Sequence, residues 1–174
     1  MTGRVAVTGT PGTGKTTATG LLETDRPVIH LNEVVRENGL VRGHDEERDT
    51  AVVDVDAIEE WLADAPPDAV VESHLAHRFP ADRVVVLRAH PETIESRLRD
   101  RGEPERTVRE NAESEALDTI LGAAVERHGR DHVYEIDTTD RTPAAVAGEI
   151  DAVVRGERVP SAGTVSFIEY THQE

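Results

Sequence analysis

The stretch that decides the fold of this chain is Gly9-Thr10-Pro11-Gly12-Thr13-Gly14-Lys15-Thr16. It matches every position of the pattern G-x-x-x-x-G-K-[ST], in which a glycine-rich loop surrounds phosphate groups. The run Arg4–Thr8 before it predicts a short buried strand. The run Thr16–Glu23 after it predicts a helix whose inward residues are Ala18, Leu21 and Leu22. Because the motif requires strand, loop and helix in this order, the stretch predicts a phosphate-binding loop rather than a chance glycine-rich turn.

The residue types of this loop suit a nucleoside triphosphate. In the segment Gly12, Thr13 and Gly14, successive backbone N–H groups can converge on phosphate oxygens, and the following helix N-terminus adds the positive end of its dipole. The ammonium group of Lys15 is expected to reach the β- and γ-phosphates of ATP, and the hydroxyl of Thr16 is expected to bind Mg²⁺.

Composition narrows the class of protein further. The chain has 174 residues, enough for one domain with a real core, and a net charge of −16 from 35 acidic and 19 basic residues. Lys15 is its single lysine, as expected of a protein from a salt-rich, halophilic cytoplasm in which the loop lysine is kept for its chemistry. Periodic apolar segments argue against the alternative of an acidic disordered protein. The acidic balance argues against broad nucleic-acid binding.

Cysteine and leader sequences give no sign of an extracytoplasmic protein. The chain contains no cysteine, which excludes disulfides and thiolate metal sites. The N-terminus leads directly into the first predicted strand, and no apolar run approaches the length of a membrane span. We therefore expect a soluble, cytoplasmic protein with no membrane partner.

Apolar runs and helical patterns alternate along the rest of the chain. Strands are predicted at Pro27–Leu31, Ala69–Ser73, Arg83–Leu87 and His132–Ile136. Helices are predicted at Asn32–Asn38, from a capping box at Asp56 and Glu59, from Pro91 to Gly102, from a capping box at Thr107 and Glu110 to Gly129, and from Thr142-Pro143 to Gly156. Val41–Asp49 is predicted to be a mobile polar loop, and Thr50–Val55 an extended apolar piece.

This alternation predicts an α/β fold of the P-loop NTPase class. We expect a doubly wound, five-stranded, mostly parallel sheet with helices on both faces and a site beyond the carboxyl ends of the strands. Residues 1–156 are expected to form a single kinase-like domain, and 157–174 a C-terminal tail. Within the tail, Pro160–Thr164 resembles a linker, and Val165–Tyr170 is either one edge strand or part of a disordered end.

Arginines are the first candidates for chemistry. Phosphoryl transfer requires positive charge where negative charge spreads over the moving group. Arg97 and Arg101 lie four residues apart near the end of one predicted helix, and Arg109 lies beyond the short loop that follows. This spacing predicts a small lid that closes arginines over a triphosphate. Solvated arginines paired with nearby glutamates are the competing interpretation.

Glu72 and His74 follow the third strand of the predicted sheet. At this position a carboxylate is expected to hold Mg²⁺ through water, so Glu72 is a candidate metal residue and the neighbouring His74 a candidate catalytic residue. His77 is three residues further on, but no carboxylate or cysteine completes a convincing zinc set.

These motifs together resemble a known family, the small adenylate kinases of archaea and eukaryotic nuclei that are linked to assembly of the small ribosomal subunit. The matching segments span about residues 4 to 118, in order and with close spacing. They are Gly9–Thr17, Asp45–Glu47 with Asp54–Asp56, Glu72–His74, Phe79-Pro80, Val86–Arg88, Arg97–Gly102 and Glu110-Asn111.

The resemblance implies an NMP-binding segment over about residues 30–53 and a short lid over about residues 100–110. It implies that Arg36 contacts the phosphate of AMP, and that ATP is contacted by Gly12, Gly14, Lys15, Thr16, Thr17 and Arg101. A loop near Thr138–Asp140 is the positional candidate for adenine contacts. Eukaryotic members typically carry Asp-x-His where this chain has Glu72-Ser73-His74, which leaves metal geometry and the balance between transfer and hydrolysis open.

Three functions fit these residues. The first is reversible transfer from ATP to AMP, with Lys15, Arg97 and Arg101 on the phosphates and direct attack by the acceptor oxygen. The second is an assembly ATPase whose partner is a basic protein of the small ribosomal subunit. The third is a P-loop kinase for another small acceptor, such as a shikimate- or dephospho-coenzyme-A-type enzyme. A regulatory GTPase is disfavoured because the guanine motif Asn-Lys-x-Asp is missing.

Overall fold

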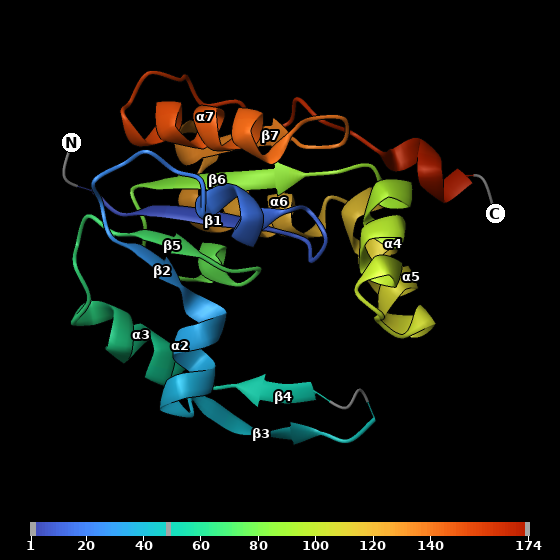
Figure 1. Ribbon diagram of the computed structural model, residues 1–174, viewed down its shortest axis with the longest axis horizontal. Helices are drawn as coiled ribbons and strands as arrows, with labels where there is room; N and C mark the ends of the chain where they lie inside the picture. The colour runs from blue at the N-terminus through green and yellow to red at the C-terminus, as the bar shows by residue number, and fades with distance from the viewer. Residues whose placement is uncertain (1–2, 48–49, 173–174) are drawn as a thin grey trace.

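The centre of the protein is a parallel sheet of five strands (Figure 1). The computed structural model describes residues 3–47 and 50–172. The sheet order is β2-β5-β1-β6-β7, with bounds β1 Val5–Gly9, β2 Val28–His30, β5 Val70–Glu72, β6 Arg83–Arg88 and β7 Val133–Asp137. All four neighbouring pairs in this order are parallel. The predicted α/β fold is confirmed, and the strand that leads into the phosphate loop is the central one.

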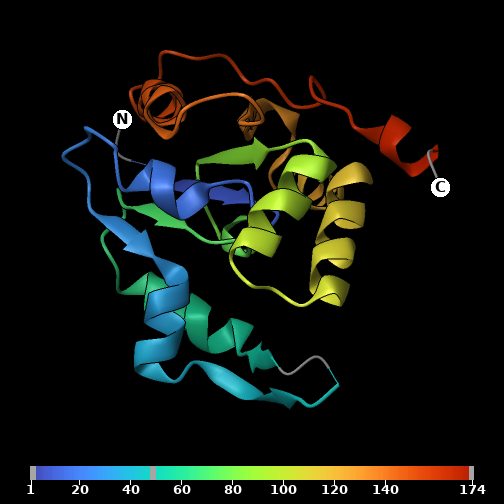
Figure 2. The same cartoon turned by 45° about the vertical axis from the view of Figure 1, so that its right-hand side comes forward.

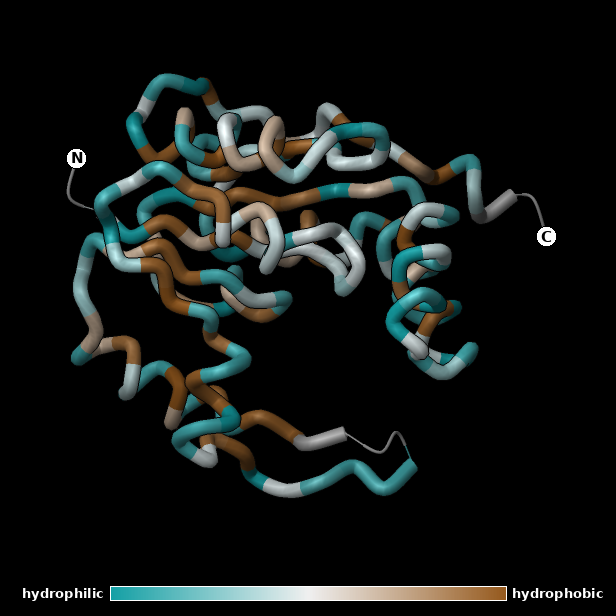
Figure 3. Tube along the Cα trace, viewed as in Figure 1, coloured by the Kyte–Doolittle hydropathy of each residue, from teal (hydrophilic) through white to brown (hydrophobic). Residues whose placement is uncertain are grey.

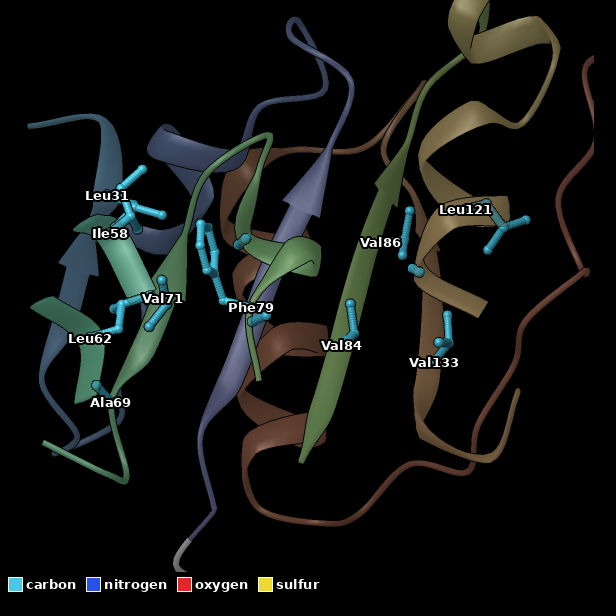
Figure 4. Packing of buried hydrophobic residues seen from close by; sticks show 13 residues of the cluster. Leu31, Ile58, Leu62, Ala69, Val71, Phe79, Val84, Val86, Leu121 and Val133 are labelled. Carbon is cyan, nitrogen blue, oxygen red and sulfur yellow. The ribbon is translucent and has the colours of Figure 1, made fainter. Parts of the chain in front are cut away.

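Alternating side chains of the strands build two hydrophobic layers. Val5 and Val7 of β1 point to one face of the sheet, where they pack with α1 (Lys15–Thr19) and α7 (Pro143–Val154). Ala6 points to the other face, which is covered by α2 (Leu31–Asn38), α3 (Val55–Ala63) and α6 (Thr119–His128). Figure 4 shows this second layer, in which Phe79 lies among residues of several strands. Burial on both faces explains why the strands are continuously apolar.

Two helices extend the molecule beyond the carboxyl ends of the strands. These are α4 (Pro91–Asp100) and α5 (Glu105–Ala116), which lie side by side in Figures 1 and 2. Ile94, Leu98 and Val108 form a small core of their own between them. The loop that joins the two helices is part of the predicted lid.

A separate two-stranded hairpin lies outside the main sheet. It consists of β3 (Val41–Asp45) and β4 (Thr50–Val53), paired antiparallel, and it lies below the sheet beside α2 in Figures 1 and 2. The prediction of a mobile loop over Val41–Asp49 is therefore wrong for β3, and positions 48 and 49 lie outside the described residues. Apart from Val41, β3 is hydrophilic (Figure 3) and largely solvent-exposed, so the sequence carries no apolar alternation that would reveal a strand.

Several helix ends differ from the predicted ones. The N-cap of α3 is Asp54, whose carboxylate accepts the N–H of Ala57 at 3.1 Å, so the capping box at Asp56 and Glu59 is wrong. α5 begins at Glu105 after Pro104, so Thr107 lies inside the helix and caps nothing. α1 ends before Gly20, and Leu21 is exposed rather than inward. Thr142 caps α7 as predicted, because its hydroxyl accepts the N–H of Ala145.

The helix predicted to run from Thr107 to Gly129 is in fact two helices. α5 ends at Ala116 and α6 starts at Thr119, because Asp118 adopts a left-handed conformation with φ of 55°. The Asp118 carboxylate accepts a hydrogen bond from Arg88 at 2.5 Å, which holds the break in place. Apolar spacing of four continues across this joint, so the pattern alone does not reveal it.

The C-terminal tail packs on the domain without forming a strand. The N–H of Ser161 donates to the Val133 carbonyl at 3.0 Å, and Thr164 and Val165 donate to Glu135. The described tail ends in a short 3-10 helix, Ile168–His172. The predicted edge strand over Val165–Tyr170 is wrong, and the disordered alternative does not describe these residues either.

Candidate active site

The phosphate loop lies at the carboxyl end of the central strand. Gly9 leaves β1 with φ of 151°, and a Cβ there would lie 2.6 Å from the carbonyl oxygen of Leu87 in β6. Gly12 has φ of 96°, and a Cβ there would press on Ile94 and Leu98 of α4. Glycine is therefore needed at both positions for backbone conformation and for close packing.

Lys15 is held in the centre of this loop. It is 7% exposed, and its ammonium group donates to the carbonyl oxygen of Thr10 at 3.1 Å. Burial lowers the pKa of Lys15 to about 8, whereas the charges of Glu72 and Glu115 raise this pKa and the charge of Arg101 lowers it. The site therefore holds a cation at neutral pH that is poorly solvated and suited to bind an anion.

Thr16 and Glu72 form an oxygen pair beside Lys15. The Thr16 hydroxyl donates to the Glu72 carboxylate at 3.1 Å, and Nδ1 of His30 lies 2.9 Å from the same oxygen. Glu72 is 3% exposed. Hydroxyl and carboxylate oxygens are ligands that Mg²⁺ accepts, and two protein ligands leave room for water and phosphate oxygens. This donor set fits a magnesium ion.

A first cavity lies on the α7 side of the phosphate loop. Its volume is about 250 Å³, and it is lined by Gly12, Thr13, Gly14, Thr17, Ala18, Arg97, Arg101, Thr138, Arg141, Pro143 and Val146. Arg97 bridges its walls, because its guanidinium donates to the carbonyls of Gly12 at 3.0 Å and Thr138 at 3.2 Å. Arg101 is exposed at its rim. The cavity thus combines backbone of the loop, two arginines and apolar wall residues.

A second cavity opens on the other side of the same loop. Its volume is about 750 Å³, and its lining includes Thr10 and Pro11 of the loop, His74 and Arg78 after β5, and Arg106 of α5. Burial lowers the pKa of His74 to about 4, the charges of Lys15 and Arg78 lower it as well, and Glu72 raises it. His74 is therefore neutral at pH 7. Glu47, in the turn of the hairpin, also lines this cavity.

The structure brings most of the candidate residues together and leaves two at a distance. Gly12, Thr13, Gly14, Thr17, Arg97 and Arg101 line the first cavity. Lys15 bonds to Thr10, which lines the second cavity, and Thr16 bonds to Glu72. Arg36 and Arg109 are exposed, and within the described part of the chain neither lines the two cavities. Arg36 lies in the last turn of α2.

Other residues of the site were not singled out from the sequence. Arg78 and Arg106 line the second cavity and Arg141 lines the first. Arg106 falls inside the predicted lid, so its position in the sequence could have marked it as a site residue. Arg78 follows a strand end, and nothing in the sequence distinguishes it from a surface arginine. His77 is buried and bonds to the Thr8 hydroxyl at 2.8 Å, which gives it a structural place behind the loop.

The parallel sheet, the phosphate loop and the Lys15–Thr16–Glu72 arrangement define a P-loop protein of kinase-like fold. A shikimate kinase structure from Acinetobacter baumannii superposes with a TM-score of 0.61 over 90% of this chain and 94% of that one, at 16% identity. The family model AAA_18, described as "AAA domain", matches residues 5–118.

Curated relatives place the chain more closely. A protein of Natronomonas pharaonis named "Putative adenylate kinase" is 61% identical over 96% of this chain and 99% of its own length. A protein of Halobacterium salinarum with the same name is 58% identical over 96% of this chain and 99% of its own. The chain belongs to this archaeal kinase family.

Across the described residues, no helix is both long and apolar enough to cross a membrane.

Proposed function

We propose that this protein is an adenylate kinase that transfers the γ-phosphoryl group of ATP to AMP and so forms two molecules of ADP. The observation that carries the proposal is the pair of cavities on opposite sides of one phosphate loop. Gly12 and Thr13 line the first, and Thr10 and Pro11 line the second. A donor and an acceptor bound in them would meet at the same loop, as direct transfer requires. The names of the archaeal relatives support the choice of substrates.

The first cavity is the proposed ATP site. Backbone N–H groups of Gly12, Thr13 and Gly14 would bind phosphate oxygens, and Thr17 would contact the nucleotide from α1. Lys15 would leave the Thr10 carbonyl for the β- and γ-phosphates. Arg101 would close from the rim with the lid at residues 100–110, and Arg97 would hold the loop and the Thr138 segment in register.

The second cavity is the proposed acceptor site. The segment 30–53, which includes α2 and the hairpin, would bind AMP, with Arg36 on the AMP phosphate after the segment closes. Arg78 lines this cavity, as does Arg106, which pairs with Glu110 at 3.2 Å and would exchange that carboxylate for the acceptor phosphate. His74 is neutral and would act as a hydrogen-bonding group rather than a cation beside the transferred group.

Thr16 and Glu72 would hold Mg²⁺, Thr16 directly and Glu72 through water. When bound, Mg²⁺ would neutralise the negative charge that develops on the phosphate groups during transfer. The protein's part is to fix the two oxygens 3.1 Å apart, with His30 orienting the carboxylate. No side-chain nucleophile is required, because the acceptor phosphate oxygen attacks directly.

A substitution of Arg36 tests the acceptor site. Arg36→Ala is expected to raise the KM for AMP at least tenfold and leave the KM for ATP within about twofold, because a phosphate–arginine contact contributes about 1.5–3 kcal/mol. Arg155→Ala is the matched control, since Arg155 is an exposed arginine at the far end of α7. An unchanged AMP dependence in Arg36→Ala would remove this residue from the acceptor site.

ATP hydrolysis is the second activity that we propose to measure. His74 lines the open second cavity and is neutral, so it can orient a water molecule when no acceptor is present.

The net charge of −16 suits a basic protein partner, such as a ribosomal protein, and it also suits a salt-rich cytoplasm. Pull-down from lysate at high salt tests the partner, and retention of no ribosomal protein by wild type would contradict it.

A further inference from the structure

Arg88 is buried among three carboxylates at the carboxyl end of β6. It is 1% exposed, and its guanidinium bonds to Glu115 at 3.2 Å, to Asp118 at 2.5 Å and to Glu135 at 2.7 Å. These partners come from α5, from the joint between α5 and α6, and from β7. A buried charge is tolerated only when it is well paired, so one arginine fixes three separate elements relative to one another.

Glu115 carries this arrangement into the phosphate loop. One of its carboxylate oxygens accepts the Thr10 hydroxyl at 3.2 Å, and the other accepts the N–H of Ala89 at 2.8 Å. The carbonyl of Thr10 in turn accepts Lys15 at 3.1 Å and the Thr13 hydroxyl at 2.8 Å. The position of Thr10 therefore sets where the lysine and the following turn of the loop lie.

The C-terminal segment 161–170 reaches the same arginine from the other side. The Phe167 ring centroid lies 5.4 Å from the guanidinium carbon of Arg88, and the Val165 carbonyl accepts its Nη1 at 3.4 Å. The segment also bonds to Glu135, because the carboxylate oxygen that does not bond to Arg88 accepts the N–H of Thr164 at 2.7 Å. In Figures 1 and 2 the segment runs to α4, where the Tyr170 hydroxyl bonds to Glu95.

We propose that Arg88 and Glu115 are positioning residues for the phosphate loop, and that the C-terminal segment 161–170 is the cover that keeps them in place, so that this segment controls affinity for ATP. The inference rests on the proposed function only in taking ATP as the nucleotide. The cover excludes water from Arg88, and ion pairs and hydrogen bonds are stronger where water is excluded. Loss of the Phe167 ring would admit water, loosen Glu115 and leave Thr10 less well held.

The proposal is tested by measuring the Kd for Mg·ATP, without an acceptor, by isothermal titration calorimetry in molar KCl. Thr10→Val removes the hydroxyl at nearly constant volume, and Thr10→Ser restores it. We expect Mg·ATP to bind about tenfold more weakly to Thr10→Val, and within about twofold of wild type to Thr10→Ser, given the size of a hydrogen bond to a charged group. A role in packing alone would not be rescued by the smaller serine.

The segment itself is tested by Phe167→Leu, which keeps an apolar side chain and removes the ring. We expect its Kd for Mg·ATP to rise about threefold to tenfold, in line with a cation–π contact, with an unchanged KM for AMP. Val159→Ser is the control, because Val159 is 78% exposed in the same tail. Since Phe167 is half-buried, this variant serves if Thr10→Val fails to fold.

The outcomes separate this inference from the proposed function. If folded Thr10→Val and Phe167→Leu bind Mg·ATP as wild type does, the inference is wrong and the kinase proposal is unaffected. If both bind weakly while wild type binds ATP without phosphorylating AMP, the inference holds and the kinase proposal is wrong. Absence of Mg·ATP binding to wild type would overturn both.

Discussion

Replacing Lys15 by methionine should stabilise the protein while it removes the proposed activity. Methionine is of similar length and is uncharged, so it can occupy the same buried space. The pKa of Lys15 is lowered from 10.5 to about 8, chiefly by burial. At pH 7 the lysine is charged in both the folded and the unfolded chain, so the folded state bears the full penalty for holding a poorly solvated cation.

The size of this effect follows from the two pKa values. Their difference, 10.5 − 8, corresponds to a penalty of about 3 kcal/mol, at 1.36 kcal/mol for each pKa unit. Methionine also loses the hydrogen bond to Thr10, which contributes about 1 kcal/mol. The free energy of unfolding of Lys15→Met should therefore exceed that of wild type by about 2 kcal/mol at neutral pH.

The sign of the pH dependence gives a second check. Between pH 8 and 10.5 the unfolded chain binds the lysine proton and the folded chain does not, so the penalty is lifted as pH rises. The advantage of Lys15→Met should fall from about 2 kcal/mol at pH ~7 to a few tenths at pH ~9.5. Urea unfolding of both proteins in the same KCl concentration measures this. If the variant is less stable than wild type at neutral pH, or if its advantage is independent of pH, burial of the charged Lys15 does not destabilise the folded protein as predicted.

Three further predictions concern other parts of the site and core. Burial, followed by the charge of Arg78, lowers the pKa of His77 to about 4, so the stability that neutral His77 contributes is fully present above pH ~6.5 and is lost as pH falls toward ~4. Between pH ~7 and ~5 the free energy of unfolding of wild type should therefore fall by about 2 kcal/mol more than that of His77→Asn. Urea-unfolding profiles that depend on pH in the same way for both proteins would contradict this. Arg97→Lys should raise the KM for ATP about tenfold, because lysine cannot donate to both Gly12 and Thr138 as the forked guanidinium does. An unchanged KM in steady-state kinetics would show that these two hydrogen bonds do not matter for ATP binding. Ile58→Ala should lower the free energy of unfolding by about 2–5 kcal/mol and leave kcat within about twofold, and a smaller loss in urea unfolding would show that the core around Ile58 collapses easily.

The sequence was most informative where residue type and backbone geometry depend on each other. The glycines, Lys15 and Thr16 of the phosphate loop are required by close approach and charge, so the pattern predicts both the loop and its neighbouring strand and helix. Continuous apolar runs likewise predict β5 and β6, because strands buried on both faces have no polar side. These features position the first cavity.

Prediction failed where a long-range contact decides local structure. The break at Asp118 depends on Arg88, which lies thirty residues away in sequence, and no local pattern links the two residues. The hairpin β3–β4 is solvated, so its pairing leaves no apolar pattern. The tail packs through Phe167 and the backbone of Thr164, and neither contact has a periodic signature.

Adenylate kinase activity is measured by following nucleotides with ³¹P NMR during turnover of Mg·ATP in molar KCl, with and without AMP. Adenylate kinase activity predicts strong stimulation by AMP, with two ADP formed for each ATP consumed and no release of inorganic phosphate in step with turnover. Formation of one ADP and one phosphate for each ATP, at a rate indifferent to AMP and to other nucleoside monophosphates, would rule out adenylate kinase activity and identify an ATPase.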